Sequence, residues 1–120
     1  DGQMRDTIPT GHEQPITTLQ REVDAWAARY WRGEYWPPHA NLARLAEEVG
    51  EVARAINQSY GPKRVKPGEG LPELAGELAD ALFTLLCIAN STGVDLQQAF
   101  DTTLKKYQGR DEEPPPSANG

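Results

Sequence analysis

The sequence predicts an all-α protein with a four-helix bundle-like protomer, and three observations support this fold class. Apolar residues recur at helical spacing in four successive segments, proline and glycine separate these segments, and no segment alternates apolar and polar residues as a strand does. The chain of 120 residues is long enough for one domain with an ordinary hydrophobic core. The single cysteine, Cys87, excludes an internal disulfide and a four-cysteine zinc site.

The first two helices are bounded by clear local signals. The first is expected over about residues 16–31, with Thr17 and Gln20 as a capping box at its start. The second is expected over about residues 38–60, with an apolar stripe along one face. Segment 61–70 contains three glycines and two prolines and is expected to be a loop.

The last two helices suggest how the protein assembles. The third is expected over about residues 71–90, and Asp95 is expected to cap the start of the fourth. The third helix is apolar over an arc about twice the roughly 100° stripe of a surface helix. Such an arc must be covered from more than one side, so we expect a homodimer or homotetramer.

Composition defines the domain limits and excludes several partners. Residues 1–15 and 109–120 are rich in Gly, Pro and polar residues and are expected to be flexible tails around a helical domain over 16–108. The net charge of −6, with no basic block, argues against nucleic-acid binding. Neither a membrane-spanning run of about 20 apolar residues nor a signal peptide is visible, so we expect a cytoplasmic protein without a membrane partner.

Two pairs of carboxylates indicate chemistry. Glu48 and Glu51 on the second helix, and Glu77 and Asp80 on the third, are each spaced i,i+3 and therefore lie on one side of their helix. Both pairs lie at the edge of an apolar stripe, so packing of the two stripes would bring the carboxylates to one cleft. Their mutual repulsion needs compensation, and Mg²⁺ binds carboxylate oxygens while leaving positions open for phosphate.

Two other interpretations of these acids are open. They could form the solvated face of a non-catalytic helical dimerisation or adaptor module, in which single cations such as Arg44 and Arg54 pair with them. A carboxylate-bridged di-iron bundle is disfavoured, because it needs Glu-x-x-His pairs and the sequence contains none.

The acidic segments resemble a known family. Residues 41–53 read NLARLAEEVGEVA and residues 77–80 read ELAD, and this arrangement resembles the E-E-x-x-E … E-x-x-D signature of the MazG-like nucleoside triphosphate pyrophosphohydrolases. Segments 89–96 and 105–111 are similar to the last-helix region of the same family. The likeness covers roughly residues 16–111.

The resemblance implies an activity and a set of metal ligands. It implies all-α dimers, or dimers of dimers, that cleave nucleoside triphosphates to a nucleoside monophosphate and pyrophosphate, as in cleaning of the nucleotide pool. The cofactor would be Mg²⁺, with Mn²⁺ as a substitute, and its ligands would be Glu48, Glu51, Glu77 and Asp80. Glu47, the third catalytic carboxylate beside Glu48 and Glu51, would be an auxiliary ligand or orient the attacking water.

The resemblance and the residue types also indicate substrate contacts. Lys106 and Arg110 match basic positions of the family and are candidates for binding phosphate, although cations near a helix C-terminus are also favoured electrostatically. Asn90 is a candidate for the sugar or phosphate, and it could equally cap a helix. Trp31 and Trp36 are candidates for stacking on the base. The sequence does not indicate which base is preferred.

Overall fold

The computed structural model describes residues 14–61 and 70–109, and within these two segments every regular element is a helix. The all-α class and the four predicted helices are therefore confirmed. The first predicted tail up to residue 13, the second from residue 110 and the loop over 62–69 lie outside the described residues. The helices are α2 (Pro15–Tyr30), α3 (Pro38–Tyr60), α4 (Leu71–Thr92) and α5 (Leu96–Gly109).

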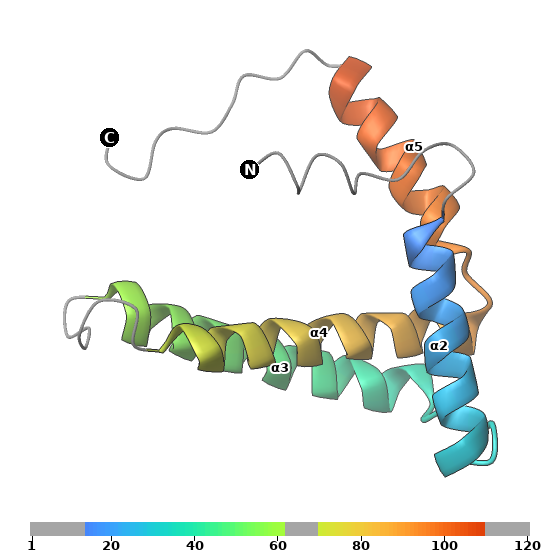
Figure 1. Cartoon of the computed structure of the whole chain (residues 1–120), viewed down its shortest axis with the longest axis horizontal. Coiled ribbons are helices and arrows are strands. Elements are labelled where there is room, and N and C mark those ends of the chain that lie inside the picture. The colour runs from blue at the N-terminus through green and yellow to red at the C-terminus, as the bar shows by residue number, and fades with distance from the viewer. Residues whose placement is uncertain (1–13, 62–69, 110–120) are drawn as a thin grey trace.

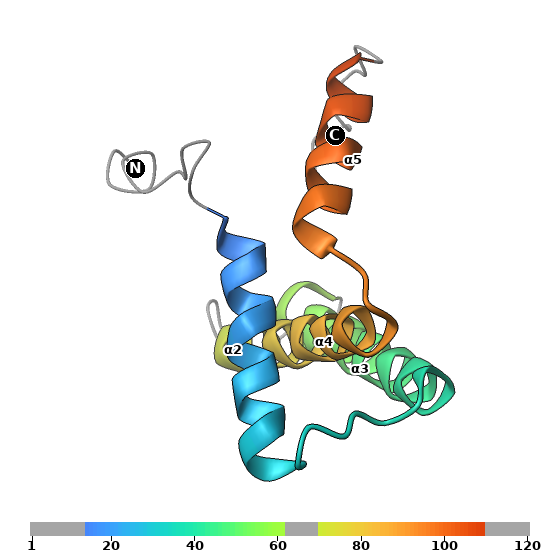
Figure 2. The same cartoon turned by 90° about the vertical axis from the view of Figure 1, so that its right-hand side faces the viewer.

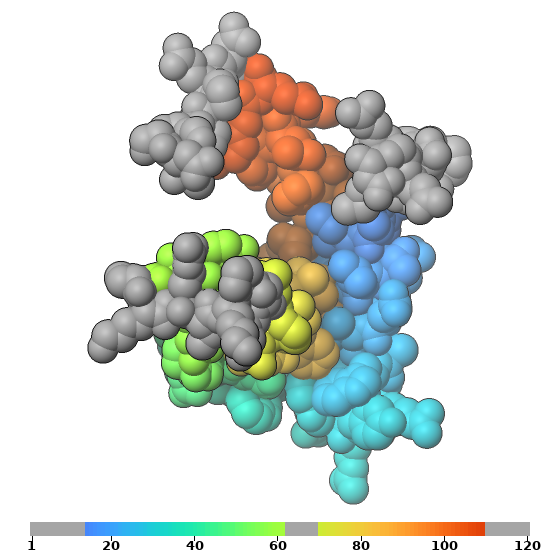
Figure 3. All heavy atoms as spheres, turned by 60° about the vertical axis from the view of Figure 1, so that its left-hand side comes forward, coloured from blue at the N-terminus to red at the C-terminus, as the bar shows by residue number. Residues whose placement is uncertain are grey.

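The α3–α4 pair is the axis of the molecule. These two helices run antiparallel side by side, and α2 lies across α4 near the C-terminal end of that helix (Figure 1). Turning the molecule shows α3 and α4 almost end-on, with α2 along one side and α5 leading away from the junction (Figure 2). In the space-filling view α5, in orange and red, stands apart from the green and yellow α3–α4 pair (Figure 3). The contacts of α5 are mainly with α2.

The helix starts differ from the expectation in one respect. Asp95 caps α5 as predicted, because its Oδ1 accepts a hydrogen bond of 3.1 Å from the Gln98 amide. The predicted capping box is wrong: the Thr17 hydroxyl donates to Gln14, and α2 begins at Pro15, whose fixed φ suits the first helical position. Gln20 points instead toward distant parts of the chain.

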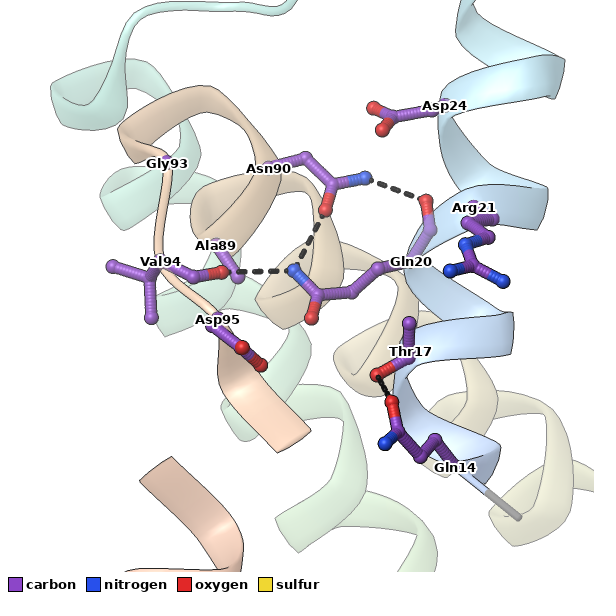
Figure 4. Close-up of a pocket in the computed structure, with 10 residues that line it drawn as sticks. All are labelled: Gln14, Thr17, Gln20, Arg21, Asp24, Ala89, Asn90, Gly93, Val94 and Asp95. Atoms are coloured by element: carbon purple, nitrogen blue, oxygen red, sulfur yellow. Dashed lines mark hydrogen bonds between the residues drawn. The ribbon is translucent and has the colours of Figure 1, made fainter. Parts of the chain in front are cut away.

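The Gln20 side chain joins α2 to the turn between α4 and α5 (Figure 4). Its Nε2 donates to Asn90 Oδ1 at 2.9 Å and to the Val94 carbonyl at 3.0 Å. Its Oε1 accepts a hydrogen bond of 3.1 Å from the Leu96 amide. Gly93 makes this turn possible: with a φ of 72° it ends α4 in a Schellman motif, in which the Val94 amide bonds to the Ala89 carbonyl.

The buried core of the protomer is small. Val23, Leu86 and Cys87 form its centre where α2 meets α4, and four partly buried side chains pack against them: Trp31, Tyr35, Phe83 and Leu96. Burial raises the pKa of the Cys87 thiol, which is therefore not activated as a nucleophile.

The apolar stripes of α3 and α4 are only partly buried within one protomer, since Leu45, Val52 and Leu74 are half-buried while other stripe residues are exposed. On α3 the stripe residues Leu42 and Val49 are 59% and 57% exposed, whereas Asn41 and Ala55 on another side are buried. On α4 the exposed leucines lie at helical spacing: Leu71, Leu78, Leu82 and Leu85. Part of each apolar stripe therefore remains uncovered within one protomer.

Among the helices that the structure describes, none is long and apolar enough to cross a membrane.

We expect Gln20→Ala to lower the free energy of unfolding by about 1–3 kcal/mol, because it leaves the Leu96 amide and the Val94 carbonyl without their partner. Urea unfolding followed by circular dichroism at a fixed protein concentration would measure the change. Glu22→Ala, at an exposed position of the same helix, is the control and should shift stability by no more than about 0.5 kcal/mol. Equal stability of the two variants would contradict the role of Gln20.

Candidate metal and substrate site

Three carboxylates converge where α3 and α4 face each other. Glu48 comes from α3, and Glu77 and Asp80 come from consecutive turns of α4. One oxygen of each lies within 4.8 Å of the others. The structure thus brings together three of the four predicted ligands, and three oxygen donors at this separation suit a hard divalent cation.

Glu48 is the most constrained member of this group. Its carboxylate is half-buried, and its Oε2 is buried without a hydrogen-bond partner in the part of the chain that the structure describes. Burial raises the pKa of Glu48, and the neighbouring charges of Asp80 and Glu77 raise it further. A buried carboxylate oxygen without a donor is costly, and a bound cation would satisfy it. The residues present therefore fit a metal ion.

The remaining two predicted carboxylates are placed differently. Glu51 lies one turn beyond Glu48 on α3, but its Oε2 pairs with the Arg54 guanidinium at 2.7 Å. This ion pair is largely exposed, so it adds little to stability and can be exchanged for another partner. Glu47 is exposed next to Glu48, and the structure does not bring it into the group of three.

An aromatic wall lies next to the acidic group. Trp31 and Trp36 are nearly parallel, with an interplanar angle of 15° and ring centroids 6.5 Å apart. Phe83, one turn along α4 from Asp80, meets Trp31 edge-on at 6.2 Å. Trp36 is 49% exposed, so part of its surface is accessible to a ligand. Both tryptophans predicted to stack on a base are therefore neighbours in this wall.

The Arg44 guanidinium lies beside the aromatic wall, on the helix that carries Glu48. It sits 5.7 Å from the ring centroid of Trp36 and 5.9 Å from that of Phe83. Its charge also lowers the pKa of Glu48, in opposition to burial and the neighbouring acids. From its position in the sequence, Arg44 was expected only as a counterion of the acids. Its spacing of four residues from Glu48 was the signal that could have placed it beside the acidic group.

Asn90 lies apart from the carboxylates, in a polar cavity of about 450 Å³ between α2 and the end of α4 (Figure 4). Its position ten residues beyond Asp80 corresponds to a rise of about 15 Å along the helix. Its Nδ2 donates to the Gln20 carbonyl at 3.0 Å and to the Tyr35 hydroxyl at 2.9 Å. The amide is thus engaged within the protein.

Tyr35 extends this hydrogen-bond network, which the sequence did not reveal. Its hydroxyl donates a hydrogen bond to Asp24. Burial, together with that hydrogen bond, raises the pKa of Tyr35 to about 12. Tyr35 therefore stays protonated at neutral pH and connects α2 to the segment before α3.

The predicted basic contacts are only partly described. Lys106 is exposed near the end of α5, with its ammonium 5.2 Å from the centroid of the Tyr107 ring. Arg110 lies outside the described residues. Lys106 belongs to α5, whereas the acidic group belongs to α3 and α4. Within the described protomer α5 extends away from the α3–α4 pair (Figure 1).

Comparison with known families gives a clear match. The sequence model of the MazG nucleotide pyrophosphohydrolase domain matches residues 37–114, a range that contains all five predicted carboxylates. Among curated proteins, the chain is 38% identical over 101 residues to the uncharacterized protein YpjD of Bacillus subtilis (strain 168). That alignment covers 84% of this chain and 90% of YpjD.

Two crystal structures are similar along most of the chain. A Bacillus-conserved MazG protein, described as a nucleotide pyrophosphohydrolase, has 35% identity and a TM-score of 0.68, with coverage of 86% of this chain and 99% of that protein. The structure of YpjD from Bacillus subtilis has 39% identity and a TM-score of 0.68, with coverage of 77% and 93%.

Glu48→Gln is expected to stabilise the metal-free protein at pH 8, by an amount on the order of 1 kcal/mol. The folded state raises the pKa of Glu48 above its unfolded value near 4.3. As pH rises above that value, the ionised Glu48 therefore lowers the free energy of unfolding. At pH 4, where the unfolded carboxyl is also largely protonated, the difference should vanish. Thermal unfolding in EDTA at both pH values would measure it, with Glu22→Gln as control. A Glu48→Gln variant that is less stable than wild type at pH 8 would contradict the conclusion that the ionised Glu48 carboxylate destabilises the folded state.

Proposed function

The chain belongs to the MazG nucleotide pyrophosphohydrolase family and is a hydrolase of phosphoric anhydride bonds, and on this premise we propose that it is a Mg²⁺-dependent enzyme that acts on nucleoside triphosphates. The reaction breaks the anhydride bond between the α and β phosphates and consumes one water. The products are a nucleoside monophosphate and pyrophosphate. Deoxynucleotides are included among the candidate substrates, and cleaning of the nucleotide pool would be its purpose.

The observation that carries this proposal is the convergence of Glu48, Glu77 and Asp80, together with a buried Glu48 oxygen that has no hydrogen-bond partner among the described residues. These three side chains would hold Mg²⁺, or Mn²⁺ as a substitute. Glu51 would join them as a fourth ligand by leaving its exposed ion pair with Arg54. When bound, the metal supplies positive charge that stabilises the phosphoryl oxygens during bond cleavage.

The remaining catalytic role is assigned to Glu47. Its exposed carboxylate adjoins Glu48, so it can accept a hydrogen bond from a water on the open side of the acidic group. We assign it to orienting the attacking water or to auxiliary metal binding. The alternative of a non-catalytic adaptor module would not explain why Glu48 is kept in a position where burial and three like charges oppose its ionised form.

Substrate contacts follow from the position of the aromatic wall. The accessible surface of Trp36, supported by Trp31, is proposed to stack on the base. The roles of Lys106, Arg110 and Asn90 in binding phosphate or sugar stay predictions. A cytoplasmic setting, where nucleoside triphosphates are found, agrees with this substrate class.

A homodimer or homotetramer is the proposed assembly. The uncovered parts of the α3 and α4 stripes contain exposed side chains at helical spacing over most of both helices, among them Val49, Leu78, Leu82 and Leu85. Apolar faces of this extent on a small protomer are typical of protein interfaces. A second copy of this chain would bury them.

Purified protein with Mg²⁺ is expected to release pyrophosphate, not orthophosphate, from at least one nucleotide of a canonical and modified panel. Glu48→Gln and Asp80→Asn should each reduce the rate by on the order of 10²–10³-fold, because each removes a charged metal ligand. The control Glu73→Gln changes an exposed acid in the first turn of α4 and should retain activity. Full activity in either ligand variant would overturn the site assignment.

Light scattering at micromolar concentration should give at least twice the protomer mass of 13.2 kDa. Leu82→Glu should shift the distribution toward the monomer, because it places a charge in the middle of the exposed α4 stripe. The same experiment on Gln98→Glu, at an exposed polar position of α5, is the control. A wild-type monomer would refute the proposed assembly.

A further inference from the structure

The hydrogen-bonding capacity of Arg44 is not used within the described residues of the protomer. The side chain is half-buried, and within the described residues its guanidinium forms neither a salt bridge nor a hydrogen bond. The neighbouring Arg54, by contrast, pairs with Glu51 at 2.7 Å. A guanidinium has five N–H donors in a planar fork that matches phosphate and carboxylate oxygens. Among the described residues, Arg44 therefore has donors without a hydrogen-bonded anion, although its charge acts on the nearby Glu48 carboxylate.

The aromatic rings fix where this guanidinium lies. Trp36 and Phe83 contact it from two different parts of the chain, the segment before α3 and the middle of α4. Asn41, one turn earlier on α3, is buried and donates a hydrogen bond of 3.4 Å to the Trp36 carbonyl, which ties the Trp36 backbone to the same helix. The guanidinium is thus held in place by stacking, and its polar edge remains available for hydrogen bonds.

Arg44 lies about one helical turn from the acidic group. Arg44 precedes Glu48 by four residues, a rise of about 6 Å along α3, and Phe83 follows Asp80 by one turn of α4. The Arg44 guanidinium therefore lies one helical turn from the carboxylates, both along α3 and along α4, on the side toward Trp36. This order places the acids, the cation and the aromatic surface in sequence along the α3–α4 pair.

We propose that Arg44 is a substrate-binding residue whose guanidinium, held against Trp36 and Phe83, binds a phosphate group of the nucleotide next to the acidic group. This inference rests on the proposed function, because it takes the three carboxylates as the metal site. A metal-bound polyphosphate carries more negative charge than one cation compensates, so a second positive group beside it strengthens binding. Arg44 also lies between the phosphates and the base that would stack on Trp36.

Inorganic tripolyphosphate is the probe that tests this role without knowledge of the base. Calorimetric titrations at fixed free Mg²⁺ would compare wild type with Arg44→Met, which keeps an unbranched apolar stem against the rings. We expect the affinity for tripolyphosphate to fall about 10- to 100-fold, the loss of charge-assisted hydrogen bonds to phosphate. Arg44→Lys should recover part of this affinity, because it restores the charge but not the fork.

Two further measurements separate phosphate binding from a merely structural role. Mg²⁺ binding in the absence of phosphate should be retained or tightened in Arg44→Met, because a positive charge near Glu48 has been removed. Arg29→Met is the matched control, since Arg29 also stacks on an aromatic ring, at 5.5 Å from the Tyr30 centroid, and should leave both affinities unchanged.

The outcomes for Arg44 and for the enzyme are distinct. Wild-type affinity for tripolyphosphate in Arg44→Met, or an equal loss of Mg²⁺ and tripolyphosphate binding, would overturn the assignment of Arg44. Binding of tripolyphosphate that depends on Arg44, in a protein that releases no pyrophosphate from any nucleotide, would support the phosphate site and reject the proposed activity.

Discussion

The close approach of three carboxylates between two paired helices is the constraint on which the rest of this structure depends. Glu48, Glu77 and Asp80 repel one another, and their repulsion is strengthened by burial. Ala55 on α3 and Thr84 on α4 are buried, and both side chains are small. Leu42, Leu78 and Leu82 are exposed within the protomer, whereas Leu45 and Leu74 are half-buried.

The sequence was sufficient to predict features that depend on local spacing. It placed four helices, the cap at Asp95 and the i,i+3 carboxylate pairs, because each follows from periodicity within a few turns. It did not predict which side of α3 packs on α4. A helical wheel favours burial of the most apolar side, but Asn41 and Ala55 are buried while Leu42 is exposed. That choice depends on packing between helices, which the spacing within one helix does not determine.

Long-range polar contacts were beyond the sequence for a related reason. Gln20 was assigned to a capping box because a suitable partner lay three residues away, yet its bonds are to Asn90 and the turn that follows α4. Arg44 was considered as a counterion because acids follow it on α3. The rings of Trp36 and Phe83 that orient it come from other elements. In both cases spacing along the sequence identified the residue but not its partner. A long side chain can adopt several rotamers, and each rotamer brings it close to a different neighbour.

The exposed leucines of α4 and the acidic residues Glu77 and Asp80 belong to the same helix. Covering the leucines can therefore change the affinity of the acidic group for an ion. Whatever covers the leucines removes water from the surroundings of that helix and lowers the local dielectric constant. Attraction between the carboxylates and a divalent ion becomes stronger in such an environment. By reciprocity, an ion that binds the covered form more tightly also stabilises that form. If the cover is the second copy proposed above, removal of the ion and dilution of the protein both favour the uncovered form.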